Sequence, residues 1–172
     1  MEGRAVTVSG LGDLFRPAMR GYFIPLTAGL LLAASTFLPW VNIGDEALRG
    51  MPAVPAMWVA GLGGLASVLA ALSIITRRNS RHPLLVIGLA ALGIMVLSWR
   101  IMPRTAGERA LTLRQAFAIV ENTPIGEAPT ALAGSGIYIG LAASAAIVGF
   151  GLTIVVKRAS QTYIVDSPDD DV

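Results

Sequence analysis

Four long apolar segments, residues 21–43, 56–76, 84–102 and 136–156, constrain the fold more than any other feature of the sequence. About 20 predominantly apolar residues are enough for an α-helix to cross the hydrocarbon core of a bilayer. Only 14% of the 172 residues are charged and 54% are hydrophobic, whereas charged residues make up about a quarter of a soluble domain. The sequence therefore predicts an all-α membrane protein with a four-helix transmembrane bundle over residues 21–158.

The two ends of the chain differ from this membrane domain. In residues 1–20 apolar side chains recur at helical spacing with Arg16 and Arg20 on another face, which predicts a cytoplasmic interfacial segment. The alternative for these residues is a partly ordered lead-in to the first span. A cleavable signal peptide is the alternative to the first span itself, but the apolar run continues to Val41, which is longer than the core of a signal peptide. Residues 159–172 close on three aspartates and lack apolar side chains that could pack, so we expect a disordered acidic cytoplasmic tail.

The longest connection, residues 103–134, is predicted to be an outer loop that contains a short amphipathic helix. Thr112 and Gln115 have the spacing of a capping box, and the apolar residues that follow share one face of a helix. We expect this helix over about residues 113–121, because Asn122-Thr123-Pro124 is a typical helix stop.

Small residues at four-residue intervals predict where helices pack. In lipid, helices associate through van der Waals contact, and small side chains let two backbones approach closely. The candidate helix-packing ridges contain Gly64 in the second span and Gly136, Gly140 and Ser144 in the fourth.

The distribution of basic residues predicts the orientation in the membrane. Cytoplasmic connections carry an excess of Lys and Arg. Three clusters that alternate with the outer connections hold eight of the thirteen basic residues: Arg4, Arg16, Arg20, Arg77, Arg78, Arg81, Lys157 and Arg158. The sequence therefore predicts a multi-pass protein of a bacterial plasma (inner) membrane with both termini in the cytoplasm.

Under this topology several aromatic residues lie near the outer face of the membrane. The candidate outer-face binding region consists of Trp40, Trp58, Trp99, Arg100, Phe117 and Tyr138. Such a cluster of aromatic rings could bind a ligand. The alternative is a girdle of separate aromatic anchors at the membrane–water interface.

Residues that perform catalysis, metal binding or redox chemistry are scarce. The chain has no cysteine, and its single histidine, His82, has no second metal ligand beside it. The span interiors lack charged side chains, which disfavours proton-coupled transport. We therefore expect no enzyme activity, no cofactor and no metal; a membrane enzyme acting at Glu108, Glu121 and Glu127 is the remaining catalytic hypothesis. The 13 basic residues are scattered along the chain, so we expect no nucleic-acid partner.

Two short motifs resemble a known group of proteins. The first span ends in Phe37-Leu38-Pro39-Trp40-Val41, and the last opens with Gly134-Ser135-Gly136-Ile137-Tyr138. With the arginine-rich turn between the second and third spans, these motifs resemble the uncharacterised four-span inner-membrane proteins of actinobacteria and related bacteria. The resemblance covers about residues 20–158 and implies the topology, but no activity and no site residue.

Together these patterns predict an accessory or scaffold integral membrane protein that docks on a larger membrane complex or associates with itself. Its partners would be the lipid bilayer and another membrane protein or a second copy of the chain. The alternative function is a small-molecule, lipid or ion pathway, or a sensor, with its binding region at the outer end of the bundle.

Overall fold

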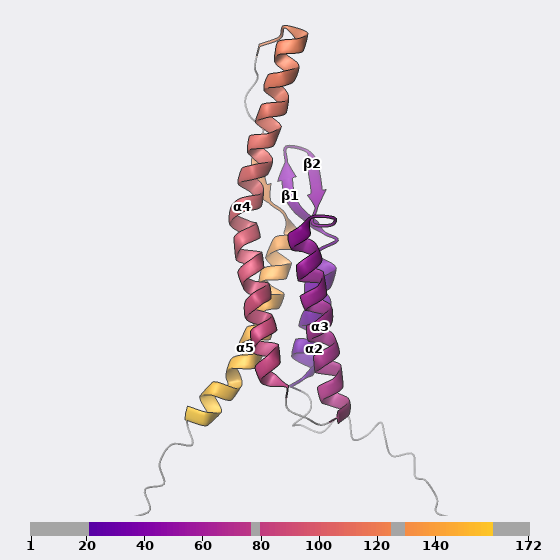
Figure 1. Ribbon diagram of the computed structural model, residues 1–172, viewed down its shortest axis with the longest axis vertical. Helices are drawn as coiled ribbons and strands as arrows, with labels where there is room; N and C mark the ends of the chain where they lie inside the picture. Colours follow the sequence, from indigo (N-terminus) through magenta and orange to yellow (C-terminus); the bar gives the residue numbers. More distant parts are fainter. Residues whose placement is uncertain (1–20, 77–79, 125–129, 160–172) are drawn as a thin grey trace, which may run out of the picture.

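The computed structural model describes residues 21–76, 80–124 and 130–159, so the predicted N-terminal interfacial segment and almost all of the acidic tail lie outside the described residues. The described part is an elongated bundle with a small sheet near one end (Figure 1). Its helices are α2 (Phe23–Ser35), α3 (Val54–Thr76), α4 (Arg81–Glu121) and α5 (Ser135–Ala159). The chain is mostly helical, as predicted.

Three of these helices, α3, α4 and α5, are long and apolar enough to cross a membrane, which indicates a multi-pass membrane protein. Helix α3 has 23 residues and no charged side chain, and it is about 34 Å long at a rise of 1.5 Å per residue. Helix α2 is also apolar but has 13 residues, which is about 20 Å. Since the hydrocarbon core is about 30 Å thick, α2 alone is shorter than a full crossing.

The prediction that the first span continues as a helix to residue 43 is wrong, because α2 ends at Ser35. Pro39 lacks a backbone N–H and disfavours helical geometry in the residue before it. The last helical turn is closed by side chains: the hydroxyl groups of Ser35 and Thr36 donate hydrogen bonds to the carbonyl oxygens of Leu32 and Ala33, each at 2.7 Å. The apolar run that follows is therefore free to form a strand.

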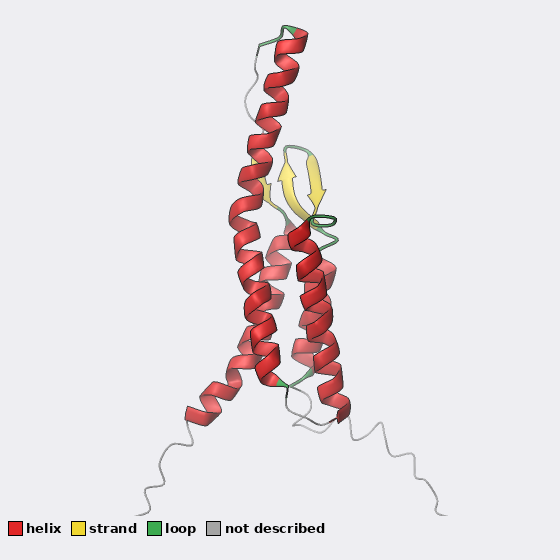
Figure 2. Cartoon of the chain, viewed as in Figure 1, coloured by secondary structure: helices red, strands yellow, loops and turns green. Residues whose placement is uncertain are grey.

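A three-stranded antiparallel sheet, which the all-α prediction lacked, lies at this end of the bundle (Figure 2). Strands β1 (Pro39–Ile43) and β2 (Glu46–Arg49) form a hairpin whose turn contains Gly44 at a φ of 56°. Glycine adopts this left-handed conformation without a steric penalty. Strand β3 (Ala131–Ala133) pairs with the other edge of β1, giving the order β2-β1-β3. The sheet thus joins the α2–α3 connection to the α4–α5 connection, and we call this end of the bundle the hairpin end.

Residues 113–121 are helical, as predicted, but the prediction of a separate short helix within a loop is wrong, since α4 is one helix of 41 residues that contains Pro103. Thr112 does not cap a new helix; its hydroxyl donates to the carbonyl oxygen of Glu108 within α4. Good helix formers dominate the chain after Pro103 and outweigh this proline. The helix ends where predicted, at Asn122, which has a left-handed φ of 52°. Beyond the sheet α4 projects from the bundle (Figure 1).

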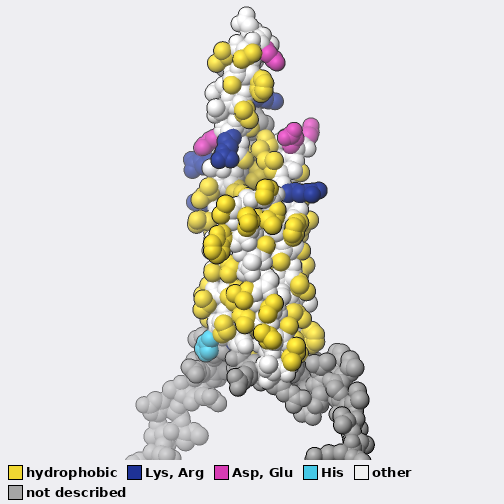
Figure 3. Space-filling model, turned by 45° about the vertical axis from the view of Figure 1, so that its right-hand side comes forward, with side chains coloured by type: hydrophobic (Ala, Val, Ile, Leu, Met, Phe, Trp, Pro, Cys, Tyr) yellow, Lys and Arg dark blue, Asp and Glu magenta, His cyan; other side chains and the backbone are white. Residues whose placement is uncertain are grey.

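The core of the bundle is apolar and runs along its length. Its largest fully buried apolar side chains include Leu32, Val59, Leu84, Met95, Ile137 and Ile147. On the face shown in Figure 3, apolar side chains also cover much of the surface of the lower bundle, while Lys, Arg, Asp and Glu gather around and above the hairpin end. Such a distribution fits helices whose outer faces contact lipid.

Candidate functional site

Trp40, the first residue of the predicted binding region, is a buried packing residue at the hairpin end. Its side chain is 1% exposed, and its Nε1 donates a hydrogen bond of 2.9 Å to the carbonyl oxygen of Ser35. Two glycines make room for the ring: a Cβ at Gly50 would lie 2.6 Å from Nε1, and one at Gly136 would lie 2.7 Å from Cδ1. Trp40 therefore fixes the sheet to α2 and α5.

The other aromatic side chains of that region lie apart on the surface. Trp58 on α3 is 65% exposed, and Trp99 on α4 and Tyr138 on α5 are exposed as well. Phe117 is 63% exposed and lies about 27 Å along α4 from Trp99. Arg100 is exposed beside Trp99. Trp40 is buried whereas these five side chains are exposed, so the six residues do not form one enclosed site.

The predicted packing ridges have two different environments. Gly136, Gly140 and Ser144 are buried along α5, where a Cβ at Gly140 would meet Met95 and the Ser35 hydroxyl group. This ridge packs inside the molecule. By contrast, a Cβ at Gly64 would meet no atom within 4 Å, so Gly64 lies on an open face of α3.

A hollow of about 230 Å³ lies between the hairpin and α4, at a place that the sequence did not reveal. From the hairpin and the turn after it, the hollow is lined by Trp40, Val41, Leu48, Arg49, Gly50, Pro52 and Ala53. From α4 it is lined by Met102, Thr105, Ala106 and Arg109. The two arginines are about 60 residues apart in the sequence, and only the hairpin's return toward α4 brings them to one hollow.

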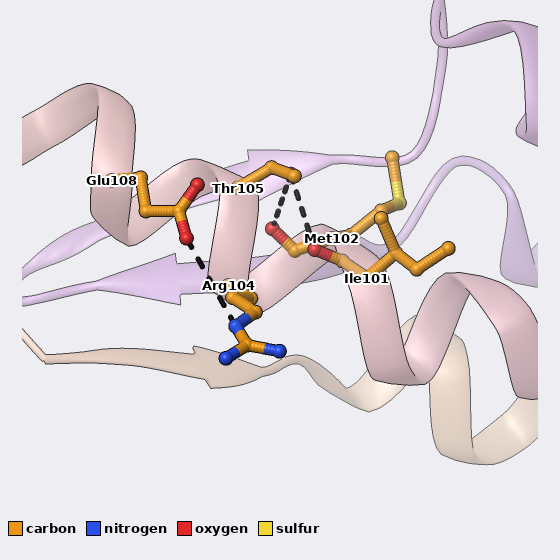
Figure 4. A network of polar contacts seen from close by, with 5 residues as sticks. All are labelled: Ile101, Met102, Arg104, Thr105 and Glu108. Atoms are coloured by element: carbon orange, nitrogen blue, oxygen red, sulfur yellow. Dashed lines mark hydrogen bonds and ion pairs between the residues drawn. The ribbon is translucent and has the colours of Figure 1, made fainter.

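The charge of this hollow is positive. Within the described part of the chain, Arg49 and Arg109 form no ion pair and no hydrogen bond. Their neighbour Arg104 instead pairs with Glu108, with 3.9 Å between Nε and Oε1 (Figure 4). Figure 4 also shows Thr105 bonded to the α4 backbone, where its hydroxyl donates to the carbonyl oxygens of Ile101 and Met102 at 3.1 and 3.2 Å. The two guanidinium groups are therefore available to an anionic group from outside.

A second hollow, of about 160 Å³, lies between α3 and α4 below the first. It is lined by Pro55 from α3 and by Ile94, Leu97, Ser98, Ile101 and Met102 from α4. Its lining is apolar apart from Ser98, and it shares Met102 with the first hollow. A third, shallow hollow of about 520 Å³ on α3 is lined by Val54, Met57, Trp58, Gly61, Leu62 and Leu65.

At the end of the bundle opposite the hairpin, a cluster of side chains joins α4 and α5 to the residue before α2. The guanidinium group of Arg81 lies 5.4 Å from the ring centroid of Phe150, and its Nη1 lies 3.5 Å from the Thr153 hydroxyl group. Tyr22 packs edge-on against Phe150 with 5.1 Å between ring centroids. This cluster contacts only groups of the chain itself and offers no hollow to a ligand among the described cavities.

Across residues 21–76, 80–124 and 130–159, no group of three or more His, Asp or Glu side chains could hold a metal ion.

Comparisons with protein-family models, with curated proteins and with solved structures give no match.

Proposed function

We propose that this chain is an accessory integral membrane protein that docks another membrane protein through the projecting part of α4. In this proposal it crosses a bacterial plasma membrane four times, with α2 as one of the crossings. The hairpin end faces outward and both termini face the cytoplasm, in accordance with the positive-inside rule. The resemblance to uncharacterised four-span inner-membrane proteins agrees with this topology.

The observation that carries the proposal is an apolar face of α4 without a described covering. Leu113, Phe117 and Val120 lie at helical spacing on this face and are 61%, 63% and 83% exposed. We call these three residues the projecting face. Met102, Ala106 and Arg109, which line the hollow beside the hairpin, continue the same face toward the bundle. The face is thus covered by the hairpin in its lower part and open above it.

Lipid does not account for the exposure of the projecting face. From Met102 to Glu121 the helix extends about 28 Å past the end of its apolar span. The apolar helices below already match a hydrocarbon core of about 30 Å, so the projecting face, which begins about 16 Å beyond Met102, stands in water. Exposed apolar patches rimmed by polar residues are typical of protein–protein contacts, and an amphipathic helix with anchors at such spacing binds a groove or another helix.

Photo-crosslinking in native membranes would test the docking. A photoreactive amino acid is placed at Phe117, and at Gln115 as the control, because residue 115 is exposed on the opposite side of the same helical turn. We expect a reproducible adduct of higher mass from position 117 and little or none from position 115. An adduct with twice the mass of the chain would identify a second copy as the partner. Recovery of only the monomer from both positions would contradict the proposal.

The second candidate function, a binding region at the hairpin end, is favoured by the positive hollow between Arg49 and Arg109. The two functions are compatible, because the projecting face begins where the hollow ends.

A further inference from the structure

We propose that the two hollows along α4 form one site for an anionic phospholipid, with the phosphate of the headgroup held by Arg49 and Arg109 and an acyl chain held between α3 and α4. This inference goes beyond the docking function and uses different residues. It rests on the charge of the first hollow, the apolar lining of the second, and the distance that the two span.

The first hollow suits a small anionic group rather than a complete drug-sized ligand. Its volume of about 230 Å³ is below the range of about 300–1,000 Å³ that is usual for pockets of small-molecule ligands. Arg49 and Arg109 approach it from opposite walls, one on strand β2 and the other on α4. Guanidinium groups match the geometry of phosphate oxygens and bind them through two parallel hydrogen bonds.

The position of Arg49 is fixed by the sheet and by the buried tryptophan. In the hairpin register, Arg49 pairs with Pro39 at the base of the two strands. The next residue, Gly50, packs against Trp40, and its N–H donates a hydrogen bond of 3.2 Å to the carbonyl oxygen of Leu38. Since its backbone is held on both sides, binding of an anionic group has to order only the Arg49 side chain.

The second hollow suits a hydrocarbon chain. Leu97 and Ile101 are exposed apolar residues of its wall. Ser98 is 4% exposed, lines this hollow, and makes no hydrogen bond within the described residues. Its hydroxyl group is therefore free to donate a hydrogen bond to a ligand. The ester oxygens of a glycerolipid, which lie between headgroup and chain, would supply an acceptor for it.

The length of the combined site matches one lipid molecule. From Ile94 to Arg109 the helix rises about 22 Å. A bilayer is about 40–45 Å thick when its headgroup regions are included. One leaflet is half of this, so its depth is nearly equal to the rise from Ile94 to Arg109. Because Met102 lines both hollows, the two hollows are neighbours, and one lipid with its headgroup in the first and a chain in the second would pass over Met102.

Native mass spectrometry of the detergent-purified full chain would test the site by titration with phosphatidylglycerol and, for comparison, phosphatidylcholine. We expect phosphatidylglycerol to bind preferentially to the natural chain. The double variant R49Q/R109Q should bind it about 10- to 30-fold more weakly, as expected when two arginines near an anionic headgroup are removed. The control R104Q/R114Q removes two charges from α4 that do not line either hollow, and should keep the affinity within about threefold.

A second variant tests the apolar half of the site without changing any charge. Leu97 is exposed at the wall of the second hollow, so L97W should fill this hollow, leave the bundle folded, and weaken phosphatidylglycerol binding. Inorganic phosphate is the probe for the headgroup hollow alone and should compete only weakly. The proposal would be overturned if the natural chain bound both lipids equally, or if the two double variants lost the same amount of phosphatidylglycerol affinity. It would also be overturned if inorganic phosphate displaced the lipid while L97W left lipid binding unchanged.

Discussion

At the scale of single residues, the structure separates glycines that are required for packing from glycines that are not. Gly136 lies at the start of α5, where a Cβ would come within 2.7 Å of both the Ser35 carbonyl oxygen and the Trp40 ring. The carbonyl is part of the backbone and cannot move away without disturbing α2. Gly64 occupies the interior of α3, where a Cβ would meet nothing within 4 Å. The sequence alone made both residues members of a packing ridge.

We therefore expect Gly136→Ala to destabilise the bundle by about 1–3 kcal/mol, the usual cost of overpacking. Gly64→Ala is the matched control, and it should leave the stability unchanged or raise it by up to about 1 kcal/mol, because alanine favours the helix. Thermal unfolding in detergent, followed by tryptophan fluorescence, measures both effects. Equal losses of stability in the two variants would show that the close contact at Gly136 does not make this glycine more important for packing than Gly64.

At the scale of elements, sequence reasoning located the apolar helices but not where they end. A 20-residue apolar run has few alternatives to a helix in lipid, so α3, α4 and α5 could be predicted from length and composition. The run from residue 39 to 43 is uncharged, like the helix before it, and a short apolar strand cannot be distinguished from a helix by periodicity. The site depends on this strand, because the hairpin brings Arg49 to α4. Arg109 was missed because residues 103–134 were predicted to be an outer loop and not a continuation of the helix.

The continuity of α4 through Pro103 gives a distance that can be measured. The chain has no cysteine, so spin labels at two introduced cysteines report on those positions only. For R100C/I119C we expect a narrow distribution that corresponds to about 28 Å between the two Cα atoms, the rise of 19 residues in a continuous helix. Adding Gly107→Pro should broaden and shorten this distribution, because proline in a helix interior removes a hydrogen bond and causes a clash. A broad distribution without the added proline would contradict a continuous α4.

At the scale of the whole molecule, the bundle is closed at both ends by different means. At the hairpin end, β1 pairs with both β2 and β3, so the two connections share one sheet. At the opposite end no strand is present among the described residues, and Arg81, Phe150 and Tyr22 form the contact between helices instead. This second closure joins the first residues of α4 to the later part of α5, which are about 70 residues apart in the sequence.

If this contact holds the lower end together, Arg81→Ala should lower the free energy of unfolding by about 1–2 kcal/mol, since a partly desolvated cation–π contact and a hydrogen bond are lost. The loss is limited, because the buried Nε of Arg81 has no hydrogen-bond partner in the described residues and its removal relieves a cost. His82→Ala is the control: His82 is the next residue of the same helical turn and is exposed. Thermal unfolding in detergent compares the two variants with the natural chain. Equal stability of the two variants would show that the sheet and the apolar core hold the bundle without this contact.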